Sequence, residues 1–156
     1  MKTFLILALF AGAAAAEFID IGYKACKSEG TVSAVKAEGC ELVVREGKKV
    51  CVFKKETKPV IQIHFKPSKN SDSLKTSIRA KVGTGGALVD FPQKNTDACK
   101  FGVKCPLVAG ENQIFEQAIV IASSHPEKEI IQVNWQLTRP NDDKEACIIF
   151  LAEIVA

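Results

Sequence analysis

Ile130-Ile131-Gln132-Val133-Asn134-Trp135-Gln136-Leu137 alternates apolar and polar side chains from Ile131 onward. Successive side chains of a β-strand point to opposite faces, so this pattern predicts a strand with one core face and one solvent face. Leu74–Val82 alternates in the same way at most positions, and Val60–Phe65 is rich in β-branched residues. A period of two therefore favours strands over helices in these segments.

Further strands are predicted on either side of these three. Leu42–Val44 and Val50–Phe53 flank Arg45–Lys49, a pattern typical of a hairpin. Ile114–Ala122 and Cys147–Val155 are more continuously apolar, as expected for strands that are buried on both faces or line a wide interior. Seven or more short strands without a long helix predict an all-β sandwich of two antiparallel sheets.

The first residues predict entry into the secretory pathway. Met1-Lys2 is followed by an apolar stretch and by small residues up to Ala16, the pattern of a cleaved signal peptide, residues 1–16. The mature chain, residues 17–156, has the length of a single domain. Six cysteines in a secreted chain indicate disulfides, although spacing alone leaves about 15 pairings open.

Residues with catalytic or metal-binding chemistry are sparse. The chain has two histidines, His64 and His125, and lacks nucleophile-elbow and C-x-x-C motifs. Asp142, Asp143 and Glu145 fit a solvated hairpin tip better than a calcium loop. The charges, 21 Lys and Arg against 18 Asp and Glu, are interspersed, which argues against a nucleic-acid surface. We expect no enzyme, no metal, no cofactor other than a bound lipid, and no nucleic-acid partner.

Several short motifs in a fixed order resemble the ML family of lipid-recognition domains, especially Niemann–Pick type C2-like sterol carriers and mite group 2 allergens. The similarity covers nearly the whole mature chain. The motifs that carry it are Gly22-Tyr23-Lys24-Ala25-Cys26, Asp90-Phe91-Pro92, Cys99 to Leu107, Ser124-His125-Pro126, Val133 to Leu137, and Cys147. The resemblance implies an immunoglobulin-like β-sandwich with an apolar cavity between its sheets, which would hold a sterol, fatty acid or related lipid.

The resemblance also implies three disulfides: Cys26–Cys147, Cys40–Cys51 and Cys99–Cys105. In similar sterol carriers the second pair lies closer together in sequence, so the segment between Cys40 and Cys51 is expected to be an extended hairpin here. The third disulfide is expected to shape one lip of the lipid pocket.

Four residues match lipid-contacting positions of the sterol carriers. Phe91 corresponds to an aromatic residue at the pocket entrance, Ile121 and His125 to the opposing lip, and Trp135 to an interior tryptophan. Each of them could instead serve ordinary packing or a turn. His125 stands where similar sterol carriers commonly have Tyr, and because imidazole can charge at mildly acidic pH, a pH-dependent gate is a hypothesis.

Three functions remain open on the sequence alone. The leading interpretation is a secreted, monomeric lipid carrier, delivered outside the cell, to the lysosome or to a gut lumen, with transient membrane or receptor contact. The second is an interaction module that presents lipid to a receptor, as innate-immune members of the family do. The third is a structural secreted sandwich whose core is filled, since apolar composition permits a cavity without requiring one.

Overall fold

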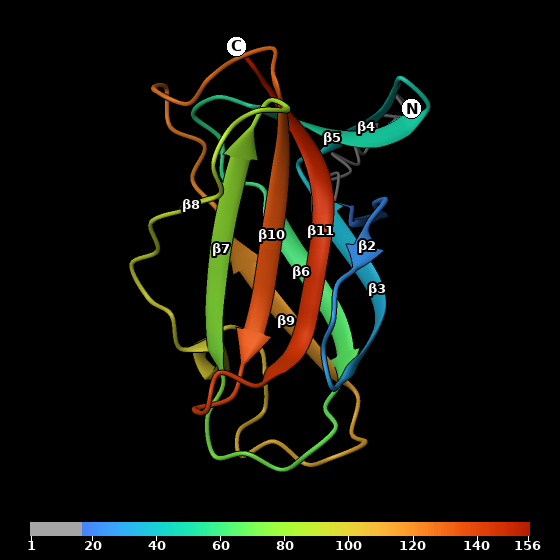
Figure 1. Cartoon of the computed structure of the whole chain (residues 1–156), viewed down its shortest axis with the longest axis vertical. Helices are drawn as coiled ribbons and strands as arrows, with labels where there is room; N and C mark the ends of the chain where they lie inside the picture. The colour runs from blue at the N-terminus through green and yellow to red at the C-terminus, as the bar shows by residue number, and fades with distance from the viewer. Residues whose placement is uncertain (1–16) are drawn as a thin grey trace, which may run out of the picture.

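The computed structural model describes residues 17–156, which form two β-sheets packed face to face (Figure 1). The predicted signal peptide lies outside the described residues. Sheet A contains, in spatial order, β1 (Ile19–Asp20), β3 (Thr31–Glu38), β6 (Val60–Lys66) and β9 (Gln113–Ala118). Sheet B contains β4 (Glu41–Arg45), β5 (Lys48–Lys54), β11 (Lys144–Val155), β10 (Ile130–Thr138), β7 (Lys75–Val82) and β8 (Val89–Asp90), with β2 (Lys24–Ala25) beside β11.

Strand β11 is the centre of sheet B. One of its edges pairs with β10 along nearly its whole length, and the other pairs first with β2 and then with β5. The β5–β11 pairing is parallel, whereas the other strand pairs are antiparallel. The predicted all-β sandwich is confirmed, and the continuous apolar run after Cys147 is explained because β11 has neighbours on both edges and both faces largely buried.

The structure corrects three details of the strand prediction. Strand β3 was not anticipated from the sequence. Strand β9 ends at Ala118 and alternates buried and exposed residues, so burial of Ile114–Ala122 on both faces is not observed. The alternative expectation, a segment that lines the interior, is met by Ile119 and Ile121 after the strand. The alternation puts Ile114 on the outer face of sheet A, where it is 45% exposed. The turn between β4 and β5 is limited to Glu46 and Gly47, both at positive φ, as in a tight hairpin.

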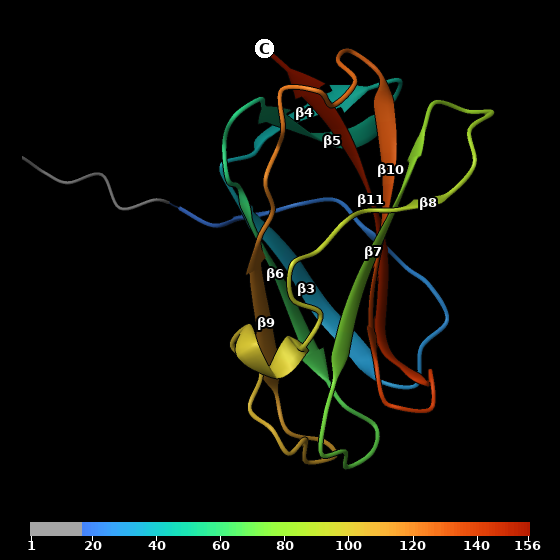
Figure 2. The same ribbon diagram turned by 90° about the vertical axis from the view of Figure 1, so that its left-hand side faces the viewer.

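The hydrophobic core lies between the two inner faces. Alternating residues of β10 and β7, including Ile131, Trp135 and Ile78, face Ile61, Ile63 and the other inward residues of sheet A. Seen edge-on, the segment after β7 crosses from sheet B toward β9 of sheet A (Figure 2). We call this segment, residues 83–97, the strap.

Three disulfides reinforce the sandwich, and they are the pairs that the family resemblance implies. Cys26–Cys147 joins the β2 region to β11, Cys40–Cys51 links the two strands of the β4–β5 hairpin, and Cys99–Cys105 closes a short loop. Because Cys26 and Cys147 lie 121 residues apart, this bond restricts the unfolded chain most, by about 4–5 kcal/mol in the chain-entropy account.

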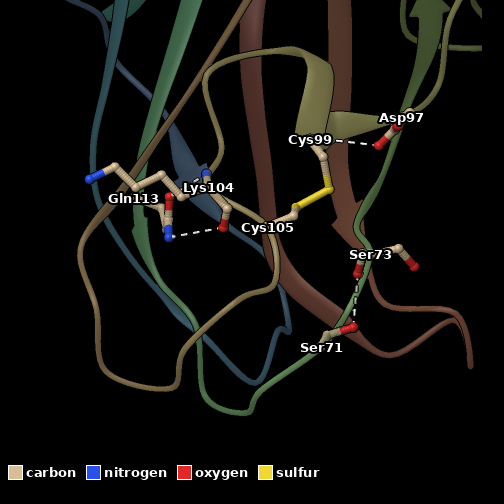
Figure 3. Close-up of a disulfide and its surroundings, with 7 residues drawn as sticks. All are labelled: Ser71, Ser73, Asp97, Cys99, Lys104, Cys105 and Gln113. Carbon is tan, nitrogen blue, oxygen red and sulfur yellow. Dashed lines mark hydrogen bonds between the residues drawn. A yellow bond between two sulfur atoms is a disulfide. The ribbon is translucent and has the colours of Figure 1, made fainter.

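Side chains around the third disulfide fix its loop to the body of the sandwich (Figure 3). The buried Gln113 accepts a hydrogen bond from the Lys104 N–H at 3.0 Å and donates one to the Lys104 carbonyl at 3.4 Å. The carboxylate of Asp97 accepts from the Cys99 N–H and caps the 3₁₀ turn η1 (Ala98–Lys100). The loop is therefore held from β9 as well as by its own disulfide.

A buried ion network joins the two sheets at one end. Glu145, at the start of β11, is fully buried, and its Oε1 lies 2.7 Å from Arg139 Nε. Its Oε2 accepts a hydrogen bond of 2.8 Å from the backbone N–H of Ser68, which follows β6 of sheet A. Arg139 also pairs with Asp143 and Glu29. The interpretation of this acidic segment as a solvated tip therefore fails for Glu145.

Within the described residues, no group of three or more His, Cys, Asp or Glu side chains is placed to hold a metal ion. No helix among residues 17–156 is long and apolar enough to cross a membrane.

We expect Glu145→Gln to lower the free energy of unfolding by about 3 kcal/mol, because one partner of a buried pair loses its charge while Arg139 stays buried. Glu29 and Asp143 still balance part of the Arg139 charge, so the loss of stability should be at the lower end of the range for broken buried ion pairs. Urea unfolding measures this difference. Asp142→Asn makes the same chemical change on an exposed neighbour and should leave the unfolding midpoint unchanged; equal midpoints for both variants would contradict the role of Glu145.

Candidate functional site

An apolar cavity of about 270 Å³ lies between the sheets, at the end opposite the Glu145 network. Its walls come from the inner faces of β7, β10 and β11 and from the loops that follow β8 and β9. The lining is hydrophobic except for Asp90 and His125. All four residues predicted from the family resemblance, Phe91, Ile121, His125 and Trp135, belong to the lining.

Trp135 closes the cavity from within. It is fully buried on β10, its ring meets that of Phe115 edge to face at 5.7 Å, and its Nε1–H donates a 2.8 Å hydrogen bond to Thr76 Oγ1. A buried indole N–H needs such a partner, and the bond fixes the ring between the two sheets. Trp135 thus has a packing role and also presents a surface to the cavity.

Several lining residues reach solvent, and we define the mouth of the cavity by four of them: Val89, Phe91, Ile119 and His125. Phe91 belongs to the strap, and its ring centroid lies 5.7 Å from that of His125 across the opening. Val89, in the strap beside Phe91, is 57% exposed. Aromatic and aliphatic groups at the water boundary give a hydrophobic ligand a continuous apolar entry.

A few separate hydrogen bonds hold the strap over the open edge of the sandwich. Strand β8 pairs with β7 over two residues, and the Phe91 N–H donates to the Ile78 carbonyl at 2.9 Å. The side chain of Gln93 donates to Gln117 Oε1 of β9 at 3.2 Å. This last bond connects the strap to the opposite sheet.

Ile121 is a buried part of the lining rather than an exposed residue of the mouth. The chain leaves β9 after Ala118 and then pairs irregularly with the turn that follows β5. The Ile121 N–H donates to Thr57 O at 3.1 Å, and the Glu56 N–H donates to Ile121 O at 2.7 Å. These bonds hold the Ile121 side chain toward the interior.

His125 closes a tight turn, residues 122–125, at the mouth. Its backbone N–H donates to the Ala122 carbonyl at 3.2 Å, and its Nδ1 lies 3.1 Å from the backbone N of Ala122, in the acceptor position of a second hydrogen bond. An imidazole nitrogen accepts only when it carries no proton, so this geometry belongs to the neutral ring with its proton on Nε2. Sequence reasoning placed His125 at the mouth but could not identify this bond.

Charged groups near the mouth are paired and directed to solvent. The Asp90 side chain is 92% exposed and lies 3.4 Å from Arg79 Nε. Glu127 lies 2.6 Å from Lys55 Nζ, and the hydrogen bond and charge of Lys55 hold the pKa of Glu127 below its ordinary value. The cavity interior therefore contains no charged side chain among the described residues, which suits an uncharged ligand body.

Two further features of the site differ from the expectation. Neither Cys99 nor Cys105 lines the cavity, so the third disulfide does not form a lip directly. Inward residues of β7 and β11, including Ala80, Val82 and Ile154, contribute to the lining and were not singled out from the sequence. The alternation in β7 shows which residues face inward, but it does not show how far apart the sheets stand.

Comparison with known proteins identifies the family. Residues 20–154 match the family model of the ML domain. This chain belongs to the ML domain family. It is 71% identical over 154 residues to the Caenorhabditis elegans protein heh-1, covering 99% of each chain. It is 25% identical to the Bos taurus NPC intracellular cholesterol transporter 2, covering 92% of this chain and 89% of that protein.

A solved structure agrees in fold. The crystal structure of a Niemann–Pick type C2 protein from the Japanese carpenter ant matches with a TM-score of 0.68 and 22% identity, covering 89% of this chain and 99% of that one. The immunoglobulin-like arrangement of the sandwich is thereby confirmed. ML domains are lipid-binding modules without enzymatic activity, which bears out the expectation that this chain is not an enzyme.

The Trp135–Thr76 bond gives a prediction for stability. Thr76→Val keeps the side-chain shape but leaves the buried indole N–H without its partner, so the free energy of unfolding should fall by about 1–3 kcal/mol. Urea unfolding, followed by the fluorescence of the single tryptophan, measures it. Ser77→Ala removes the neighbouring hydroxyl on the opposite face of β7 and is the matched control; equal losses in both variants would contradict a specific role for the bond.

Proposed function

We propose that this protein binds one lipid molecule, a sterol, a fatty acid or a related compound, in the cavity between its sheets and carries it through water. The observation that supports this most is the apolar cavity of about 270 Å³ with a hydrophobic mouth. Homology to a protein named as a cholesterol transporter agrees with it. We assign contacts with the lipid to Phe91, Ile121, His125 and Trp135.

The energetics favour a ligand that is almost entirely apolar. Each Å² of apolar surface removed from water contributes about 25 cal/mol, and the lining demands no hydrogen-bonding partner from the buried part of the ligand. Among the described lining residues, His125 presents its Nε2 at the mouth, while the Asp90 side chain is directed to solvent and pairs with Arg79. A lipid with one polar end at the mouth matches this distribution.

The cavity volume limits how such a ligand is accommodated. An engineered apolar cavity of about 150 Å³ already admits benzene, and ligand pockets commonly measure about 300–1,000 Å³. At about 270 Å³, this cavity accepts a single acyl chain or part of a ring system as it stands. A larger lipid requires the sheets or the strap to move outward.

We also infer that the protein is secreted. The support is the signal-peptide pattern of residues 1–16 together with three disulfides, which persist in oxidising compartments. N-terminal sequencing of protein from its natural source should begin at Glu17; a chain that retains Met1 contradicts this inference.

Quenching of Trp135 tests lipid binding at this site. Bromine atoms quench indole fluorescence on contact, so a dibrominated stearic acid or a brominated sterol should quench the single tryptophan in a saturable way. Ala152→Phe places a ring into the cavity from β11 and should raise the Kd of the lipid at least about tenfold. This corresponds to a loss of about 1.4 kcal/mol in binding free energy.

Ala118→Phe is the matched control for this experiment, because Ala118 is exposed on β9 and its side chain does not line the cavity. It should bind like the wild type. If no brominated lipid quenches Trp135, or if both variants lose binding equally, lipid carriage in this cavity is contradicted. Circular dichroism of each variant separates lost binding from lost folding.

A further inference from the structure

We propose that His125 is a proton-operated latch of the cavity mouth: the neutral ring holds residues 122–125 in a closed turn, and protonation opens the turn. Faster lipid exchange at acidic pH is the expected consequence. The consequence for exchange depends on the proposed function, whereas the opening of the turn does not.

The chemistry of the latch follows from one hydrogen bond. The Ala122 N–H points at His125 Nδ1 across 3.1 Å, which requires an unprotonated Nδ1. When the ring gains a proton, Nδ1 becomes a donor, and two N–H groups then face each other. The closed turn thereby loses an acceptor and gains a repulsive contact, so the ring must rotate or move away.

The position of the ring turns this local change into a change at the mouth. His125 faces Phe91 across the opening, and both side chains line the cavity. Phe91 is anchored by its backbone to Ile78 of β7. The turn that carries His125 has exposed Ser123 and Ser124 at its tip, and backbone hydrogen bonds of Ile121 and Lys128 anchor the chain on either side of it. Opening of the turn is therefore confined to the residues between these anchors.

Nearby charges offer the protonated ring no partner where it stands. On the loop of His125, Glu127 forms an ion pair with Lys55 of the turn after β5. On the strap, Asp90 forms an ion pair with Arg79 of β7. Glu153 of β11 pairs with Arg45. Further charged side chains on the strap, on the loop of His125 and at the near ends of β5, β6 and β7 are Lys54, Glu56, Lys58, Lys81, Lys94, Asp97, Lys128 and Glu129. Within residues 17–156, none of these groups forms an ion pair with His125.

The second histidine provides a matched control. His64 lies on the outer face of sheet A, where its Nε2 is 3.1 Å from Gln62 Oε1. Burial, and next the charge of Lys36, lower the pKa of His64, while Asp20 opposes them. A His64→Gln variant therefore removes one imidazole far from the mouth and leaves the latch intact.

Amide hydrogen exchange tests the latch without any lipid. In the wild type and in His64→Gln, the protection factor of the Ala122 amide should fall by about fivefold or more between pH 7.5 and 5.0, the scale of losing one intramolecular hydrogen bond. In His125→Phe the ring cannot accept, so protection should be low at both pH values. An Ala122 protection factor that is independent of pH in the wild type overturns the proposal. This result is expected if the protonated ring stays in place against Phe91 through a cation–π contact.

Lipid exchange supplies the second readout. Dehydroergosterol, whose hydroxyl does not titrate in this range, should transfer to uncharged phosphatidylcholine vesicles about fivefold faster at pH 5.0 than at pH 7.5. The pH dependence should persist in His64→Gln and shrink below about twofold in His125→Phe. If Ala122 protection changes but the protein binds neither dehydroergosterol nor a brominated lipid, the latch stands and the proposed function fails. If protection changes while exchange stays constant in all three proteins, the link between turn and mouth is overturned.

Discussion

The buried carboxylate of Glu145 determines how the two sheets meet. It belongs to β11 of sheet B, yet it accepts a hydrogen bond from Ser68 after β6 of sheet A and lies against Arg139. Removing either partner would leave a buried charge uncompensated, so the loops after β6 and β10, which carry Ser68 and Arg139, have little freedom to separate. The sandwich is thereby closed at one end by polar contacts, while the lining at the other end is hydrophobic except for Asp90 and His125.

This polarity difference explains where the cavity forms. Between the sheets, Trp135 and Phe115 fill the middle of the sandwich and are fixed by the indole hydrogen bond to Thr76. Beyond Trp135, the inner face of sheet B carries small or branched residues such as Ala80, Val133 and Ala152, which do not fill the space. Close packing would require larger side chains there, and the strap, held by few hydrogen bonds, covers the gap without filling it.

The strands were accessible from the sequence because the period of two is a local property, as β10 and β7 show. The burial of Glu145 could not be predicted in this way. It depends on Arg139 and Ser68, which come together with Glu145 only in the folded structure. Family resemblance placed Phe91 and His125 in the site, but neither resemblance nor alternation could reveal which atom of His125 bonds to Ala122. Sheet separation likewise follows from three-dimensional packing and not from periodicity.

The size of the cavity and the entry of a ligand into it are therefore controlled by different parts of the molecule. The walls of the cavity belong to β7, β10 and β11, whose continuous ladders resist local opening. The mouth depends on single bonds, among them Gln93 to Gln117 and Ala122 to His125, each with a net contribution of about 1 kcal/mol. Breaking one of them changes access by a modest factor without endangering the fold. A ligand can thus be held by the large apolar area of the walls and still be exchanged through a mouth that needs little energy to open.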